Sequence, residues 1–260
     1  MVTGASMGIG RACAERLDRA GWNVIGASRR GTSSGAWHSL TMDVDDDSSV
    51  AQGIASVVHD HGRLDALVTC AGWGLAGAAE QTSTEVAKAQ LETNFWGTVR
   101  CVHDVLPTFR EQGGGRIVMI GSIGGVIGLP FQAFYSASKF ALEGYAEALA
   151  YEVAPYNVHV TLVEPGNFKT DFTKSRRMVN VPSTDPYAAA RDRAISKMER
   201  DELNGADPAS VAVTVERVLN AKRAPRRVSA GKMNERAGLF AKRVLPYRVF
   251  ESSIRGSLGV

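Results

Sequence analysis

The chain has 260 residues and a formal net charge of +3; 44% of its residues are hydrophobic and 22% are charged, which is enough apolar material for one sizeable buried core. No apolar run approaches the roughly 20 residues that a membrane-spanning helix needs, and no secretion signal opens the chain, so we expect a cytoplasmic protein without an integral membrane segment. Three cysteines without paired spacing favour neither a disulfide framework nor a metal site.

Short apolar runs that are typical of buried strands alternate with longer segments of helical period. The strands are predicted at residues 1–3, 23–27, 66–69, 116–120 and 159–164. Alternation of this kind predicts an α/β fold, with a single doubly wound, Rossmann-type parallel sheet and helices on both faces. We expect residues 1–260 to form one domain.

Two features of this plan are irregular. The first strand is predicted to run only from Met1 to Thr3, which is short for a central strand; either an upstream segment completes it or the sheet accommodates a truncated strand. Residues 29–43 also leave no room for a full crossover helix. A Gly/Ser-rich loop, Gly31 to Gly35, and at most one helical turn are therefore expected between strands two and three.

Residues 3–10, Thr-Gly-Ala-Ser-Met-Gly-Ile-Gly, follow the first strand and open a helical pattern. The first glycine permits a tight turn, the second lets the backbone approach a pyrophosphate, and the third lets the helix pack close to the sheet. The helix N-terminus would present its N–H groups and positive dipole end to phosphates. The predicted cofactor contacts of this turn are Gly4, Ser6, Met7, Gly8, Ile9 and Gly10.

The end of the second strand bears on cofactor choice. An NAD enzyme needs an acidic residue there for the ribose 2′-hydroxyl, and a carboxylate would repel a 2′-phosphate. This strand instead runs into Ser28, Arg29 and Arg30. Because guanidinium groups form paired, charge-assisted hydrogen bonds to phosphate, we predict that these residues bind NADP(H). The alternative is that the arginine pair merely ends the strand in solvent.

Two helices carry boundary signals. Thr82 to Glu85 has the T-x-x-E pattern of a capping box and predicts a helix that begins there and ends near Pro107. Asp207 followed by Pro208 predicts the N-cap and the first position of a later helix.

Tyr135 and Lys139 lie four residues apart in a helical segment and would share one face. Ser122 follows the strand at 116–120, and Asn94 lies on the preceding helix. Reduction of a carbonyl needs a hydride from a nicotinamide and a proton for the developing alkoxide. A tyrosine, whose ordinary pKa is about 10, needs a nearby positive charge to act near neutral pH, and Lys139 would supply it. The Ser122 hydroxyl would stabilise the substrate oxygen.

The glycine turn, followed in order by these residues, resembles the short-chain dehydrogenase/reductase family over most of the chain. The resemblance implies a catalytic tetrad of Asn94, Ser122, Tyr135 and Lys139. In the family the lysine also holds the nicotinamide ribose, and the asparagine holds a water that connects the lysine to solvent. It further implies cofactor contacts by Asp43, Val44, Cys70, Ala71, Gly72, Asn94, Tyr135, Lys139, Pro165, Gly166, Phe168 and Thr170.

One departure from the family pattern concerns residues 69–72. The family has Asn-Asn-Ala-Gly there, and this chain has Thr-Cys-Ala-Gly. The resemblance otherwise implies an NADP(H)-dependent oxidoreductase that interconverts a carbonyl and an alcohol, assembled as a homodimer or homotetramer. The alternative is a non-catalytic, dinucleotide-binding structural or redox-sensing protein of the same fold, which loss of Tyr135 or Lys139 would mark; both are present.

The substrate is expected to be a lipophilic small molecule. Residues 124–131 are apolar and uncharged, which indicates a hydrophobic pocket, although they could also be ordinary core. Residues 129–131 and 138–144 resemble the 17β-hydroxysteroid and retinol dehydrogenase side of the family, which implies a steroid-, retinoid- or polyketide-like substrate. The predicted substrate-binding residues are Ser122, Ile123, Leu129, Tyr135, Phe168 and Phe172.

The last third of the chain is basic. Residues 174–260 carry 18 Lys and Arg against 9 Asp and Glu, whereas residues 1–173 carry 12 against 18. Such a surface could face nucleic acid, an anionic membrane or an acidic carrier, but its charges alternate with apolar residues and no base-reading motif accompanies them. We therefore expect a solvated surface and no nucleic-acid partner.

Two segments of this third have predicted roles. Residues 166–206 resemble a long substrate-binding loop with helical parts. The tail at 239–260 is amphipathic and could be a packed terminal helix, a subunit contact or a weak membrane-surface helix, of which packing is expected.

Overall fold

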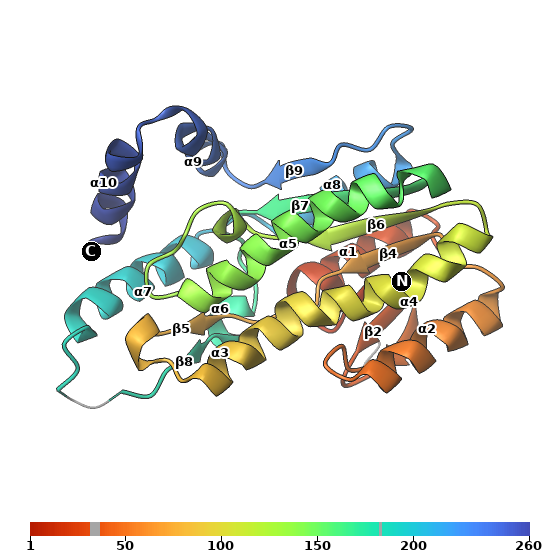
Figure 1. Cartoon of the computed structure of the whole chain (residues 1–260), viewed down its shortest axis with the longest axis horizontal. Coiled ribbons are helices and arrows are strands. Elements are labelled where there is room, and N and C mark those ends of the chain that lie inside the picture. The colour runs from red at the N-terminus through yellow and green to blue at the C-terminus, as the bar shows by residue number, and fades with distance from the viewer. Residues whose placement is uncertain (32–36, 182–183) are drawn as a thin grey trace.

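The computed structural model describes residues 1–31, 37–181 and 184–260, and Figure 1 shows a central sheet between layers of helices. Seven parallel strands form this sheet in the order β3-β2-β1-β4-β6-β7-β9. The predicted doubly wound, Rossmann-type α/β fold is confirmed. The order reverses between β1 and β4, and ligands of such sheets bind at this switch point, beside the carboxyl ends of the strands.

The predicted strands agree with the observed ones to within two residues. The sheet consists of β1 Val2–Thr3, β2 Ile25–Ser28, β3 His38–Thr41, β4 Ala66–Thr69, β6 Gly115–Ile120, β7 Val158–Pro165 and β9 Arg227–Ala230. The short β1 still pairs on both sides, since Val2 is in register with Gly26 and with Val68. Of the predicted loop between β2 and β3, residues 32–36 lie outside the described part of the chain.

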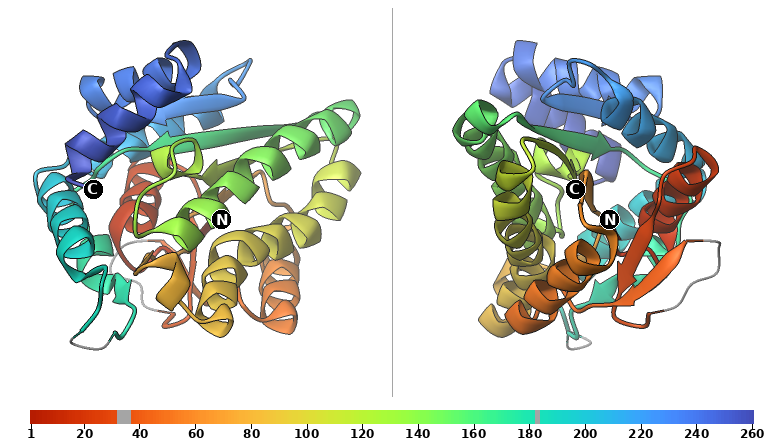
Figure 2. Two further views of the ribbon diagram at one scale, coloured as in Figure 1. Left: turned by 60° about the vertical axis from the view of Figure 1, so that its left-hand side comes forward. Right: turned by 90° about the vertical axis from the view of Figure 1, so that its right-hand side faces the viewer.

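Helices cover both faces of the sheet, and the last two helices of the chain lie beyond β9 (Figure 2). The helices are α1 Gly8–Arg19, α2 Asp47–His61, α3 Thr84–Leu91, α4 Gly97–Glu111, α5 Ala133–Glu152, α6 Phe172–Ser175, α7 Ala188–Leu203, α8 Ala209–Asn220, α9 Met233–Val244 and α10 Tyr247–Leu258. Within the described ranges, none of them combines the length and the apolar character needed to cross a bilayer.

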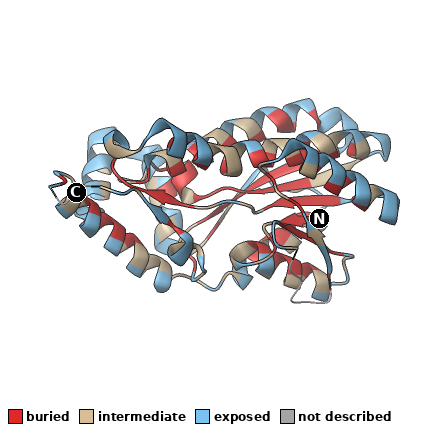
Figure 3. Cartoon of the chain, turned by 90° about the horizontal axis from the view of Figure 1, so that it is seen from below, coloured by how far each residue is buried: buried red, intermediate tan, exposed pale blue. Residues whose placement is uncertain are grey.

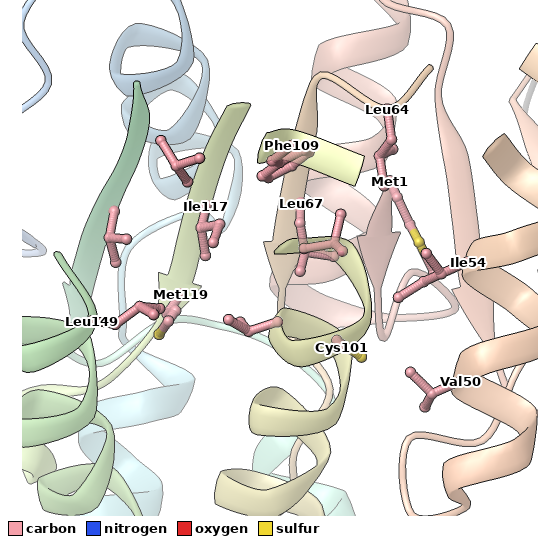
Figure 4. Packing of buried hydrophobic residues seen from close by; sticks show 14 of the residues in the cluster. Met1, Val50, Ile54, Leu64, Leu67, Cys101, Phe109, Ile117, Met119 and Leu149 are labelled. Carbon is pink, nitrogen blue, oxygen red and sulfur yellow. The ribbon is translucent and has the colours of Figure 1, made fainter. Parts of the chain in front are cut away.

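Two hydrophobic clusters fill the space between the sheet and its helices. On one face, α2, α4 and α5 contribute Val50, Cys101 and Leu142, and Figure 4 shows part of this cluster against the strands. On the other face, α1 and α8 contribute Leu17 and Val215. Figure 3 shows buried residues along the strands and on the inner sides of the helices. Because both faces of the sheet are covered, its carboxyl edge is left for a ligand.

The predicted helix start at Thr82 is wrong by one residue. The hydroxyl of Ser83 accepts from the N–H of Val86 and caps α3, whereas the Thr82 hydroxyl donates to the carbonyl of Ala78. The later helix, α8, begins at Ala209 with Pro208 as its N-cap, one residue after the predicted start, and the carboxylate of Asp207 accepts from the N–H of Ala209 at 2.8 Å.

The predicted helix end near Pro107 is also wrong. A π-helical turn, Glu92–Trp96, joins α3 to α4, and α4 continues to Glu111 with Pro107 inside it. Proline removes one N–H from the helix and leaves the carbonyl of His103 without its usual partner. Both residues lie on the exposed side of α4, where that carbonyl can bind water, so the helix continues.

Candidate active site

A pocket of about 660 Å³ opens at the carboxyl ends of the strands. Residues that follow β1, β2, β4, β6 and β7 line it, which places it at the reversal of strand order. Of all the residues predicted for the cofactor and the substrate, only Asn94 is missing from its wall. The sequence therefore located this pocket from segments that are far apart in the chain.

The glycine turn forms one end of the pocket. Gly4 has a φ of +65°, and a Cβ at this position would lie 2.8 Å from the backbone nitrogen of Ala71. A Cβ at Gly10 would overlap the carbonyl oxygen of Gly4, so neither position tolerates a side chain. Met7 precedes α1 and makes no capping hydrogen bond within the described chain. The N–H groups and positive dipole end of α1 can therefore serve a diphosphate, and the turn fits a dinucleotide.

Thr3 supports the segment that replaces the family's asparagine pair. Its hydroxyl oxygen accepts from the N–H of Cys70 at 3.1 Å and from that of Ala71 at 3.3 Å. The buried hydroxyl of Thr69 finds no hydrogen-bond partner among the residues described. Support for Cys70 and Ala71 thus comes from β1, a contribution that the sequence pattern did not suggest.

Asn94 lies in the π-helical turn, behind the pocket wall. Its Oδ1 accepts from the N–H of Trp73 at 3.0 Å, and its Nδ2 donates to the Trp73 carbonyl and to the Ser138 hydroxyl, both at 3.1 Å. The extra residue in a π-helical turn is commonly found at functional sites. The structure thus places Asn94 as the support of Trp73, while Asn94 itself is not among the residues that line the pocket.

Ser122, Tyr135 and Lys139 converge on the floor of the pocket. A Cβ on Gly124 would lie 3.2 Å from the Tyr135 ring and 3.3 Å from the Ser122 Oγ, so both side chains border the same small space. Lys139, one helical turn after Tyr135 on α5, is 7% exposed and donates from Nζ to the carbonyl of Ile120 at 2.9 Å. The predicted face of α5 does carry both groups into the pocket.

The electrostatics of the pair differ from the prediction. Burial raises the pKa of the Tyr135 phenol, and a hydrogen bond with Ser122 opposes this only in part. Burial also lowers the pKa of Lys139 to about 8. The ammonium is engaged with Ile120, so the predicted lowering of the tyrosine pKa by Lys139 is not seen here. At pH 7 the phenol is protonated and can donate a proton.

We predict that Lys139→Met stabilises the ligand-free protein by roughly 2–3 kcal/mol near pH 7, because the ammonium is held with its pKa near 8 instead of 10.5. Above pH 10.5, the pKa of this lysine in the unfolded chain, Lys139 is neutral in both states and does not destabilise the folded protein. As the pH falls from 10.5 to about 8, the unfolded chain binds a proton and the folded protein does not, so the folded protein loses stability. Urea unfolding at several pH values measures the difference between the two proteins. It should shrink between pH 8 and 10.5; a difference that is constant with pH would contradict the assignment.

The far end of the cofactor space is basic. Ser28, Arg29 and Arg30 line it where β2 ends, as predicted, and the Arg30 guanidinium donates to the Ser6 hydroxyl at 3.3 Å. Asp43 and Val44 border the same end.

In residues 1–31, 37–181 and 184–260, no group of three or more His, Cys, Asp or Glu side chains is placed to hold a metal ion.

The other end of the pocket has an apolar side. Leu129, Phe172, Met198 and Leu258 line it, and the rings of Phe172 and Tyr135 lie 5.7 Å apart between centroids. Met198 comes from α7 and Leu258 from the last turn of α10, and the sequence suggested neither. The predicted loop at 166–206 is largely ordered as α6, a short strand β8 (Arg177–Met178) and α7; its Pro182 lies outside the described residues.

Polar side chains also line this end of the pocket. Arg177 lies over the ring of Trp73 with 4.3 Å between the guanidinium carbon and the ring centroid. Asp201 accepts from Lys197 at 2.5 Å, and Glu202 is paired with the buried Arg176. These ion pairs compensate the carboxylates, so the wall is polar without a large net charge. The presence of apolar and polar side chains at one end of the pocket suits an amphiphilic ligand.

Comparison with known proteins extends these observations over the whole chain. A family model described as short chain dehydrogenase matches residues 1–180. A 3-ketodihydrosphingosine reductase from Bacteroides thetaiotaomicron is 37% identical over 257 residues, which cover 98% of this chain and 96% of that protein. Retinol dehydrogenase 8 from Bos taurus is 34% identical over 249 residues, 87% of this chain and 79% of that protein.

One solved structure is also close. The crystal structure of a short-chain dehydrogenase from Streptomyces avermitilis has a TM-score of 0.83 and 32% sequence identity to this chain, covering 98% of this chain and 96% of that one. The similarity thus includes α9 and α10 as well as the sheet.

Proposed function

Since the chain belongs to the short-chain dehydrogenase family, as its motifs predicted, we propose that it is an NADP(H)-dependent oxidoreductase that interconverts a carbonyl and an alcohol. The observation that carries this proposal is the meeting of three groups in one pocket: the phenol of Tyr135, the hydroxyl of Ser122 and the ammonium of Lys139. The same pocket reaches the glycine turn, so a dinucleotide and a substrate can meet there.

The proposed chemistry assigns a task to each group. When bound, the nicotinamide supplies a hydride to the carbonyl carbon. Tyr135 donates its proton to the carbonyl oxygen, which becomes the hydroxyl of the product. Ser122 donates a hydrogen bond to the same oxygen and stabilises the negative charge that develops there.

Lys139 has a supporting role in this scheme. Once Tyr135 has given up its proton, the nearby ammonium stabilises the phenolate and favours the transfer. By family resemblance the same ammonium holds the ribose of the nicotinamide, in place of the carbonyl of Ile120 that it contacts here. Asn94 keeps Trp73 and the adjoining pocket wall in position.

The preference for NADP(H) rests on the basic end of the pocket. Arg29 and Arg30 follow β2 where an acidic residue would select NAD(H). Both guanidinium groups border the pocket, and neither of them is engaged there by an ion pair within the described chain. A 2′-phosphate could accept hydrogen bonds from them.

We propose a long-chain ketone with a polar head, of the 3-ketodihydrosphingosine class, as the substrate. Such a molecule has an apolar chain to contact Leu129, Met198 and Leu258, and hydroxyl and amino groups to contact Asp201 and Glu202, which line the same end of the pocket. The similarity to a 3-ketodihydrosphingosine reductase supports this class over the rigid skeletons of steroids and retinoids.

The substrate class predicts a clear order of activities. We expect kcat/KM for 3-ketodihydrosphingosine to exceed that for a steroid ketone, retinal or a short polar ketone by at least about tenfold. The reason is that only its long alkyl chain can cover the apolar residues that line the pocket. NADPH consumption measures these activities. Met198→Trp should raise KM for the long-chain ketone more than for the short one, and Leu203→Trp, at an exposed position of α7, is the control. Activity confined to short polar carbonyls would reject this class.

A further inference from the structure

The last two helices expose apolar side chains in a band along one side of the molecule. Met233, Phe240 and Val244 lie at helical spacing on α9 and are 80%, 67% and 57% exposed. Leu245, in the turn before α10, and Tyr247, the first residue of α10, continue the band. Figures 1 and 2 show both helices on the outside of the molecule, beyond β9. We call these five residues the C-terminal band.

The band does not result from a loose tail, because the inner side of α9 is tied to the body. Glu235 accepts from the backbone N–H of Asn167 at 2.9 Å and from its side chain at 2.8 Å. Lys242 donates to the carbonyl of Val126, and its Nζ lies 5.0 Å from the centroid of the Phe140 ring. Leu239 is buried. The orientation of α9 is thus fixed, with the band outward.

Cations accompany the band. Arg236 and Arg243 are exposed seven residues apart on α9, so they follow the same side of the helix, and Arg248 is exposed just after the turn. Residues 232–260 contain six Lys and Arg against two Asp and Glu. Glu235, one of the two acids, is turned inward. An apolar band bordered by arginines suits an anionic surface with an apolar interior.

The charges also argue against a second copy of the chain as the occupant. A symmetric dimer through this face would bring its arginines against those of the partner, since an interface of that symmetry uses the same patch twice. Like charges in contact oppose association. The excess of cations instead favours a negatively charged partner.

We propose that the C-terminal band binds an anionic lipid surface and brings the substrate pocket to that surface. The inner side of α10 links the two sites, because Phe250 and Ile254 are partly buried and Leu258, one turn further on, lines the pocket. The backbone carbonyl of Gly259 accepts from Arg193 of α7 at 3.0 Å, which holds this end in place. An amphiphilic ketone held in the lipid could then reach the pocket beside the bound helix.

The test is co-sedimentation of the full chain with vesicles of phosphatidylcholine, with and without phosphatidylglycerol. We expect binding to the anionic vesicles that weakens as salt is added. Phe240→Ser with Tyr247→Ser, and separately Arg243→Glu with Arg248→Glu, should each reduce the partition by at least about tenfold, since one cation near an anionic surface contributes about fivefold. Reduction of a short, water-soluble ketone should be unchanged in both variants, which shows that they fold.

Matched controls come from the opposite end of the sheet. Lys222→Glu with Arg223→Glu makes the same change of charge in the exposed turn before β9, and Tyr156→Ser removes an exposed aromatic ring after α5. Both should bind vesicles as the unaltered chain does. Absence of binding, binding equal in controls and variants, or a dimer in light scattering that only the C-terminal variants disrupt would each overturn the proposal; the last result would assign the band to a second copy.

Discussion

Replacing Tyr135 with phenylalanine is expected to lower kcat/KM for ketone reduction by about 10²–10⁴-fold and to leave NADPH binding nearly unchanged. The substitution removes one hydroxyl, the proposed proton donor, from a ring that is otherwise buried. Phenylalanine fills the same space and keeps the contact with Phe172, so the fold and the cofactor end of the pocket should persist.

The measurement is NADPH consumption at saturating cofactor, together with a fluorescence titration of NADPH binding. Tyr145→Phe is the matched control, because this tyrosine lies on the same helix with its ring against Phe95, away from the pocket. It should retain near-normal activity. Undiminished turnover in the Tyr135 variant would remove this residue from the reaction, and a parallel loss of NADPH binding would indicate a structural role instead.

Arg29→Asp is expected to shift the ratio of kcat/KM for NADPH to that for NADH by roughly 10²-fold toward NADH. The substitution removes a donor to the 2′-phosphate and adds a carboxylate, which repels that phosphate and can accept from a free 2′-hydroxyl. Comparing both cofactors at one substrate concentration measures the ratio.

Arg110→Asp is the control for this experiment, since it changes the same charge at an exposed position near the end of α4, outside the pocket wall. Its cofactor ratio should equal that of the unaltered protein. An unaltered protein that prefers NADH, or an Arg29 variant with an unchanged ratio, would show that the basic end of the pocket does not select the cofactor.

The parts of the fold and site that the sequence predicted depend on local patterns. Strands such as Ala66–Thr69 are short apolar runs that must be buried on both faces, and their short length between longer segments of helical period identifies them. Tyr135 and Lys139 share a side of α5 because residues four apart always do in a helix. The glycine turn could be located for a similar reason, because Gly4 has a positive φ and Gly10 lies against the carbonyl of Gly4, six residues earlier.

What the sequence did not predict depends on contacts between distant segments. Met198 and Leu258 complete the pocket from α7 and α10, and no motif distinguishes them from ordinary apolar residues of a helix. The support that Thr3 gives to Ala71 requires β1 and β4 to be adjacent. The usual preference of proline predicts a helix end at Pro107, and its exposed position on α4 overrides that preference.

The pKa values of the site show the same limit. A lysine one turn from a tyrosine could point at the phenol, and the predicted lowering of the tyrosine pKa assumed that it does. In the structure, Nζ of Lys139 is 2.9 Å from the Ile120 carbonyl, and burial dominates the pKa of both groups. Where a flexible side chain points depends on which acceptor the fold offers.

The most direct test of the account is a crystal structure of the protein in complex with NADP⁺. We predict that the diphosphate lies on the glycine turn at the start of α1, the 2′-phosphate contacts Arg29, and the nicotinamide ring lies beside the Tyr135 hydroxyl with Lys139 turned from Ile120 to the ribose. A dinucleotide that avoids the glycine turn, or a nicotinamide remote from Tyr135, would contradict the proposed enzyme.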